Sequence, residues 1–304
     1  MIAESTIDIA GPASNAAHVP PHPHVSAEPA IVAEIYDALD NNRLDLPTLP
    51  DMALKIQSLI DDPNVSADRV VNLLSSDPVV YMHIIRAANS AALSNGRPAS
   101  DLRSAISRLG YRMLRSLVLN VTMSKLFQAR SPYVNQQLKE LWQHSREVAA
   151  NSYVLAQRHK HLKPEQAMLA GLVHDIGALP LYLYADRYHA RLDQTTLEEL
   201  VHKFSAAIGT RLLKNWNFPE ELVAVPAGHD DLLRANNSGV ADYVDVVTVA
   251  NLQIPGAAKF VAWANVFAAE RLGYYAGECQ NFLTDHAEQL AVIKGMLDVN
   301  ATRH

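Results

Sequence analysis

The stretch AGLVHDIGALPLY, residues 170–182, places two adjacent polar side chains, His174 and Asp175, inside an apolar segment with helical character. A polar group in an apolar interior costs free energy unless it is hydrogen-bonded or paired. We therefore expect His174 and Asp175 to find partners on other segments of the chain. Those partners define the candidate site, and the segments that carry them indicate the fold.

Two further histidines are suitable partners. His144 lies upstream on a predicted long helix covering residues 133–161, and His229 lies downstream in AGHDDL, residues 227–232. Side chains on successive helices can converge inside a helical bundle. One interpretation is a metal site, because imidazole and carboxylate groups bind divalent ions when several of them meet. The other is a set of buried, hydrogen-bonded residues that hold the helices in register.

Helical periodicity extends outward from this stretch to most of the chain, starting near residue 31. Ser66 is a predicted N-cap, Pro78 suits a first helical turn, Ser100 or Asp101 can cap the next helix, and Gly110 interrupts it. The β-branched run VVTV, residues 246–249, is short and lies within helical periodicity. The predicted fold class is all-α. Later helices are predicted at about 164–174, 176–188, 195–215, 219–228, 240–252, 256–271 and 284–299.

Composition excludes several classes of protein. The 304 residues are 49% hydrophobic, and 26 Lys and Arg against 32 Asp and Glu leave a net charge of −6, so no global field attracts nucleic acid or anionic membrane. The single cysteine, Cys279, excludes an internal disulfide framework and a multi-thiolate zinc site. No apolar run reaches the ~18 residues of a spanning helix, and the N-terminus lacks a secretory pattern. We expect a soluble, cytoplasmic protein.

Several motifs in one order carry a resemblance to a known family. The order His144 … His174-Asp175 is similar to the HD superfamily of metal-dependent phosphohydrolases, and the surrounding sequence more closely resembles its HDOD branch, the HD-related output domain of bacterial signalling proteins. The matching segments are LPTLPDMALKIQSLIDDPNVS (46–66), SSDPVVYMHIIRAANSAAL (75–93), SAISRLGYRMLRSLVLN (104–120), WQHSREVAANSYVLA (142–156), AGLVHDIGALPL (170–181), IGTRLLKNWNFPEEL (208–222) and AGHDDL (227–232).

The resemblance implies a division of the chain. An HDOD domain at 31–255 would comprise a family-specific lobe at about 34–130 and an HD-like lobe at about 131–255. Residues 1–30, rich in proline and histidine, form a predicted disordered leader, and residues 256–304 a C-terminal helical extension. Members of this family are mostly regarded as non-enzymatic. We therefore expect a bacterial signalling or scaffolding module that acts through protein–protein contacts and requires no cofactor.

A comparison with the related HD-GYP phosphodiesterases supports the absence of catalysis. His144, His174, Asp175 and His229 match their metal ligands, but four other positions differ and the GYP loop has no counterpart. The departures are Ala178 for a lysine, Ser205 for a histidine four residues before Gly209, Asp230 for the second histidine of a pair, and Asn251 for the closing aspartate.

These departures weaken the expected metal chemistry. Asn251 offers a neutral oxygen where a hard cation prefers a carboxylate, and Ala178 removes a cation that would stabilise phosphate charge. We expect no catalytic residues, and at most one weakly held divalent ion at His144, His174 and Asp175. The alternatives are an HD-type phosphodiesterase acting on a cyclic di-nucleotide, and a receptor that binds a nucleotide messenger without cleaving it.

Three arginines form the remaining candidate surface. Arg108, Arg112 and Arg115 follow the spacing i, i+4, i+7, which places them on one face of a helix. They are candidates for binding a phosphate or an acidic partner, and the alternative is an ordinary solvated face. One short basic stripe without a recognition motif does not indicate DNA binding.

Overall fold

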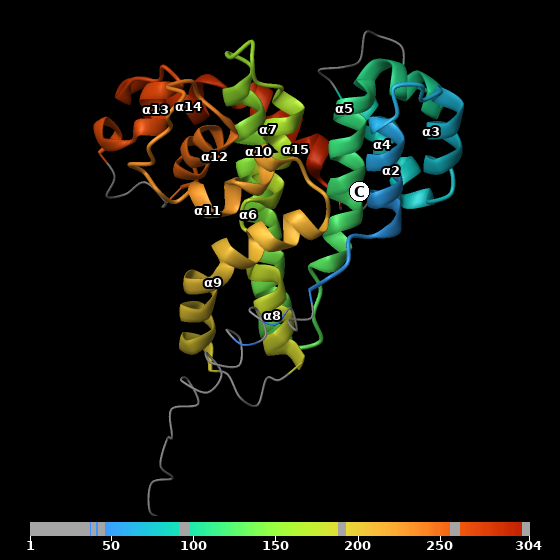
Figure 1. Cartoon of the computed structure of the whole chain (residues 1–304). Coiled ribbons are helices and arrows are strands. Elements are labelled where there is room, and N and C mark those ends of the chain that lie inside the picture. The colour runs from blue at the N-terminus through green and yellow to red at the C-terminus, as the bar shows by residue number, and fades with distance from the viewer. Residues whose placement is uncertain are drawn as a thin grey trace, which may run out of the picture.

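The chain folds into α-helices joined by short loops, as the computed structural model shows (Figure 1). The structure describes residues 37, 41, 46–90, 98–187, 193–255 and 262–299, and these contain no strand. The all-α prediction is confirmed for them. The predicted leader at 1–30 lies outside the described residues.

The first group of helices begins where the local signals predict. Ser66 accepts a hydrogen bond from a backbone N–H of the following helix, Asp77 does the same before Pro78, and Asp101 forms a capping box. Gly110 adopts φ 73°, a left-handed conformation that kinks the longest helix of the group. The group consists of α2 Asp51–Asp61, α3 Ala67–Leu74, α4 Pro78–Ala88 and α5 Leu102–Met123, followed by a 3-10 turn, η1, at Ser124–Leu126.

The centre of the molecule is formed by α6 and α7, which pack along each other (Figure 1). The long helix ends at Ala156 rather than at the predicted residue 161, so the four basic residues Arg158, His159, Lys160 and His161 follow the helix. The central elements are α6 Pro132–Ala156, α7 Pro164–Val173, α8 Ala178–Arg187 and α9 Gln194–Asn215.

The later helices are shorter than the sequence pattern predicts. The predicted helix at 219–228 is divided into two because Pro226 lacks the N–H that would continue it. The helix predicted at 284–299 corresponds to the helix Ala287–Leu297, and the helix Ala276–Asp285 before it was not predicted. The elements are α10 Glu220–Val223, α11 Val225–Gly228, α12 Tyr243–Leu252, the 3-10 turn η3 Trp263–Asn265, α13 Phe267–Arg271, α14 Ala276–Asp285 and α15 Ala287–Leu297.

The main buried cluster runs from α2 to α15 and so spans both predicted lobes, and a smaller cluster of Leu181, Leu200, Phe204 and Ile208 lies between α8 and α9. The C-terminal helix α15 packs against α4, α5 and α6, which joins the chain's last helix to its first group. The division into two lobes therefore stays a prediction. The helical stretch Pro164–Arg187 is long and apolar enough to cross a membrane, but 83% of its most apolar window is buried, as in the core helix of a soluble protein.

Candidate functional site

Small residues let α6 and α7 approach closely enough to bring two histidines together. A Cβ atom on Gly171 would lie 2.6 Å from the Cα of Ala149, so only glycine fits this crossing. His144 lies on α6, and His174 directly follows α7. Their Nε2 atoms are 3.2 Å apart. The predicted convergence of His144 with His174 is confirmed by this geometry.

The turn that carries His174 and Asp175 is equally close to α9. A Cβ atom on Gly177 would lie 1.8 Å from the carbonyl oxygen of Ser205 and 2.5 Å from the amide nitrogen of Gly209. The backbone at Ser205 therefore contacts the turn two residues past Asp175. A histidine in place of Ser205 would project from a segment that touches the site, which makes the serine a meaningful departure from the HD-GYP pattern.

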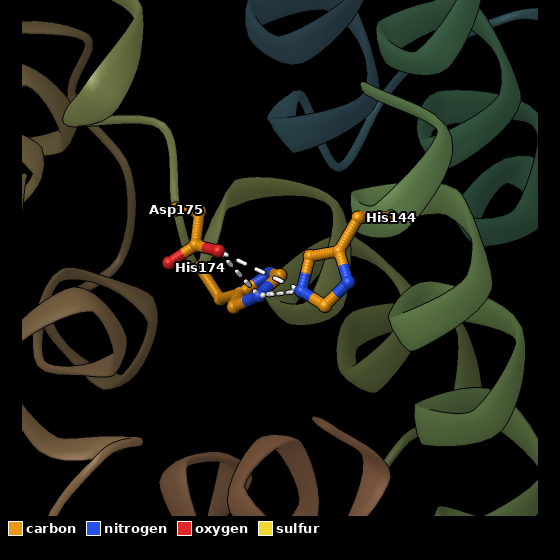
Figure 2. Close-up of side chains that lie close together, drawn as sticks. All are labelled: His144, His174 and Asp175. Atoms are coloured by element: carbon orange, nitrogen blue, oxygen red, sulfur yellow. Dashed lines mark hydrogen bonds and ion pairs between the residues drawn. The ribbon is translucent and has the colours of Figure 1, made fainter. Parts of the chain in front are cut away.

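Asp175 approaches His144 and His174 (Figure 2), and it also lies close to His229. Its Oδ2 atom is 3.1 Å from Nε2 of His174 and 3.6 Å from Nε2 of His144, and its Oδ1 atom is 3.4 Å from Nε2 of His229. His174 and His229 are buried, whereas His144 and Asp175 are partly exposed. Three imidazoles from three segments thus converge on one carboxylate that solvent can reach.

Asp230 occupies the edge of the site. Its Oδ1 atom is 3.4 Å from Nε2 of His229, but its side chain is 81% exposed. An exposed carboxylate remains hydrated and contributes little to a stable arrangement. Asp175 is therefore the carboxylate that organises the cluster.

Hydrogen bonds to the backbone orient the two buried imidazoles. Nδ1 of His174 lies 2.8 Å from the carbonyl oxygen of Gly171, and Nδ1 of His229 lies 3.1 Å from that of Val225, so each Nδ1 donates its proton. In the neutral ring, Nε2 then presents a lone pair, and in both residues it faces Asp175. Lone pairs that face a carboxylate repel it unless a proton or a cation lies between them. A hydrogen bond from one ring nitrogen to a backbone carbonyl is typical of histidines that ligate a metal through the other nitrogen.

The pKa shifts of the cluster residues indicate positive charge next to Asp175. Burial lowers the pKa of His144, and the neighbouring His174 lowers it further. Burial raises the pKa of the Asp175 carboxyl, but His174 and His229 outweigh it and hold that pKa well below its usual range. Burial opposes the charged form of His229, yet the hydrogen bond and charge of Asp175 raise its pKa. The cluster thus favours ionised Asp175 facing a proton or a cation.

The residues present fit one divalent ion and not two. One ligand atom from each of His144, His174 and Asp175 lies within 4.8 Å of the others, which is a spacing that one ion can bridge. Among the described residues, the carboxylates in contact with these histidines are Asp175 and the exposed Asp230. A two-metal centre needs more anionic ligands than this set supplies.

The other predicted positions lie on neighbouring elements. Asn251 lies near the end of α12, and its Oδ1 atom is buried without a hydrogen-bond partner among the described residues. Ala178 is buried at the start of α8, three residues past Asp175, so this position adds no positive charge to the site.

The three arginines do not form one free basic stripe. The kink at Gly110 separates Arg108 from the other two, which corrects the regular spacing assumed from the sequence. Arg108 donates to the carbonyl oxygen of Ala88, 2.8 Å away, and Arg115 donates to Gln166, 2.9 Å away. Only Arg112 is exposed. Arg108 and Arg115 therefore have structural roles between helices.

One polar network near the site was not predicted. Asp245, fully buried on α12, accepts hydrogen bonds from Arg234 at 2.7 Å and from Nε of Arg271 at 2.9 Å. Arg234 belongs to the loop that follows His229, and its side chain also lies against Gly228. The network thus fixes the segment that presents His229. An aspartate inside the apolar run YVDVVTVANL was the signal that could have identified it.

The fold and the cluster together define an all-helical protein with an HD-type site. The HDOD domain model matches residues 46–232, and the chain belongs to the HDOD family. The chain is 25% identical over 242 residues to an uncharacterized protein of Treponema pallidum (strain Nichols), matching 74% of this chain but only 44% of that protein. The chain thus spans less than half the length of this curated relative.

Solved structures share the fold. The "Putative metal-dependent phosphohydrolase" from Shewanella amazonensis SB2B has a TM-score of 0.77 and 26% identity, with 90% of this chain and 100% of that chain covered. An HDOD domain protein with unknown function from Geobacter sulfurreducens has a TM-score of 0.64 and 22% identity, with 90% and 99% covered. The chain therefore has an HD phosphohydrolase-like fold.

Proposed function

We propose that this chain is a non-catalytic HDOD signalling module that acts through protein–protein contacts and retains a reduced HD site. The observation that carries the proposal is the ligand set: a single partly buried carboxylate, Asp175, serves His144, His174 and His229. Hydrolysis of a phosphodiester by a two-metal centre needs two ions that clamp the attacking and leaving oxygens. The ligands here support at most one ion.

The surroundings of the cluster support the same function. Phosphoryl chemistry depends on preorganised positive charge at the phosphate. Ala178 and Ser205 adjoin the turn that carries Asp175, and neither supplies a cation or an imidazole. His144, His174, Asp175 and His229 connect α6, α7 and α11, which supports a structural role for these four residues. Weak binding of one metal ion is compatible with this function. The similar Shewanella protein is named as metal-dependent, and the backbone hydrogen bonds of His174 and His229 leave their Nε2 atoms directed at Asp175.

Calorimetric titration of the metal-free protein with Mn²⁺ at neutral pH tests the proposal. We expect at most one ion per chain, with any binding lost in His174→Ala because one of the three converging ligands is removed. His202→Ala, which removes an exposed histidine from α9, is the matched control and should titrate like the wild type. Two tightly bound ions per chain would contradict the proposal, because that stoichiometry is the one a phosphohydrolase needs.

A further inference from the structure

A cavity of about 530 Å³ lies between α5, α6 and α15, with the start of α7 at its edge. This size is within the roughly 300–1,000 Å³ typical of small-molecule sites. The cavity involves none of the residues of the HD cluster. It is bordered by a helix of the C-terminal extension, which neither the HDOD match at 46–232 nor the HD site includes.

The floor of the cavity is apolar. Met113 of α5, Val154 of α6, and Ile293 and Met296 of α15 are all buried and line it. Methionine side chains are flexible and polarisable, so they adapt to apolar molecules of different shapes. This floor fits the hydrocarbon body of a ligand.

The polar residues of the cavity favour a positive charge on the ligand. Glu165 lies in the first turn of α7 and Glu288 in the first turn of α15, and both side chains line the cavity. Arg108 also borders the cavity, but its guanidinium donates to the carbonyl oxygen of Ala88 and to Oδ1 of Asn89. The cavity is thus lined by two carboxylates and one arginine, and the arginine already donates to other groups of the protein.

Tyr153 adds an aromatic ring to the same cavity. Glu165 lines the same cavity, and burial followed by the charge of Glu165 raises the pKa of the Tyr153 hydroxyl. An aromatic ring beside carboxylates is a common environment for organic cations, because the ring face attracts positive charge.

We propose that this cavity binds a small organic cation that combines an apolar body with a protonated amine. The apolar body would occupy the floor formed by Met113, Ile293 and Met296, and the amine would lie between Glu165 and Glu288. The site does not depend on the proposed function of the HD cluster. Because α15 also packs against α4, α5 and α6, a bound cation would brace the contact between the C-terminal extension and the first group of helices.

Three probes with one apolar body and different head groups test the proposal by calorimetry on the full chain. They are 2-naphthylmethylamine, 2-naphthylmethanol and 2-naphthoate, which are cationic, neutral and anionic at neutral pH. We expect the amine to bind at least about threefold more tightly than the alcohol, as for a partly exposed ion pair, and the carboxylate not to bind. Added salt should weaken binding of the amine and not of the alcohol.

Variants locate the binding site. Glu288→Gln should weaken binding of the amine about threefold and leave the alcohol unchanged, because only the charge pair is lost. Glu199→Gln, at an exposed position on α9, changes the net charge equally and should have no effect. Val292→Phe, which fills the cavity from α15, should abolish binding of both probes.

Three results would overturn the proposal. One is no binding of the amine, and another is equal affinity for all three probes. The third is equal weakening by Glu288→Gln and Glu199→Gln, which would show that the net charge of the protein and not this cavity attracts the amine. Glu288 is exposed, so its substitution is compatible with folding and keeps the test decisive even if Val292→Phe fails to fold.

Discussion

Asp175 is the residue on which the candidate site depends. Its two carboxylate oxygens face the Nε2 atoms of His144, His174 and His229, which come from three separate segments. Because backbone carbonyls hold Nδ1 of both buried histidines, these rings cannot turn away without losing a hydrogen bond. The arrangement is stable only when a proton or a cation offsets the facing lone pairs.

Replacing Asp175 should therefore reduce stability. Asp175→Ala leaves three imidazoles without their common partner, and we expect the free energy of unfolding to fall by about 1–3 kcal/mol. Thermal denaturation followed by circular dichroism measures this change. Asp230→Ala removes an exposed carboxylate from the next position and should cost less than about 0.5 kcal/mol. An unchanged melting temperature in Asp175→Ala would show that the carboxylate is free to serve a ligand.

His83 provides a prediction about pH. Burial, together with the charges of Arg86 and Arg146, lowers its pKa from 6.5 to about 4, and Asp298 opposes this only in part. Below pH 6.5 the unfolded chain binds a proton at His83 that the folded protein does not bind until about pH 4. The stability that neutral His83 contributes is therefore fully present above pH 6.5, and the free energy of unfolding falls by up to about 3 kcal/mol as the pH decreases toward 4.

Chemical denaturation at pH 7 and at pH 4.5 measures this loss. His83→Gln keeps an acceptor for Arg86, which lies 2.9 Å from Nδ1 of His83, but it cannot be protonated. Its loss of stability between the two pH values should be smaller than that of the wild type. Parallel losses in the two proteins would show that other groups cause the pH dependence.

At the scale of elements, the crossing of α6 and α7 builds the site. Gly171→Ala would place a methyl group 2.6 Å from the backbone of Ala149 and force the helices apart, so we expect a loss of about 1–3 kcal/mol. Gly295→Ala is the matched control, because its new methyl group would meet nothing within 4 Å inside α15. That control should be stabilised by about 0.5–1 kcal/mol. Equal stability of the two variants in urea denaturation would refute the role of the close crossing.

The sequence predicted the beginnings of helices better than their ends. The caps at Ser66 and Asp101 and the first-turn proline at Pro78 are local signals carried by a few residues, and each is confirmed. Periodicity alone extended two helices too far: α6 ends at Ala156 and not at residue 161, and the missing N–H of Pro226 divides the helix predicted at 219–228. The second break has a local signal, a proline inside the predicted helix, which periodicity does not take into account.

The site shows the same limit. The convergence of His144, His174, Asp175 and His229 followed from their order and from the family resemblance. The sequence analysis placed the three arginines on one helix face although Gly110, which it predicted to interrupt the helix, lies between Arg108 and Arg112, and the structure shows the kink there. The cavity beside α15 was not visible in the sequence, because it is formed by helices that are far apart along the chain.

At the scale of the whole molecule, one continuous core joins the first helices, the HD-type site and the C-terminal extension. Two hydrogen bonds to the end of α15 show this connection. Arg86 donates to the carbonyl oxygen of Asp298, and Asn120 donates to the carbonyl oxygen of Leu297 at 2.9 Å. A change at α15 therefore reaches α4 and α5 directly. This connectivity suits a module whose output is a change in its protein contacts.

The proposed function requires that the HD-type site does not catalyse hydrolysis of a phosphodiester. The most direct measurement is hydrolysis of cyclic di-GMP by the purified protein supplied with Mn²⁺ or Fe²⁺, compared with His174→Ala under the same conditions. We expect no hydrolysis above background in either protein, because one carboxylate and three imidazoles do not supply the ligands of a two-metal phosphodiesterase centre, and Ala178 provides no cation to stabilise phosphate charge. Turnover by the wild-type protein that disappears in His174→Ala would contradict it.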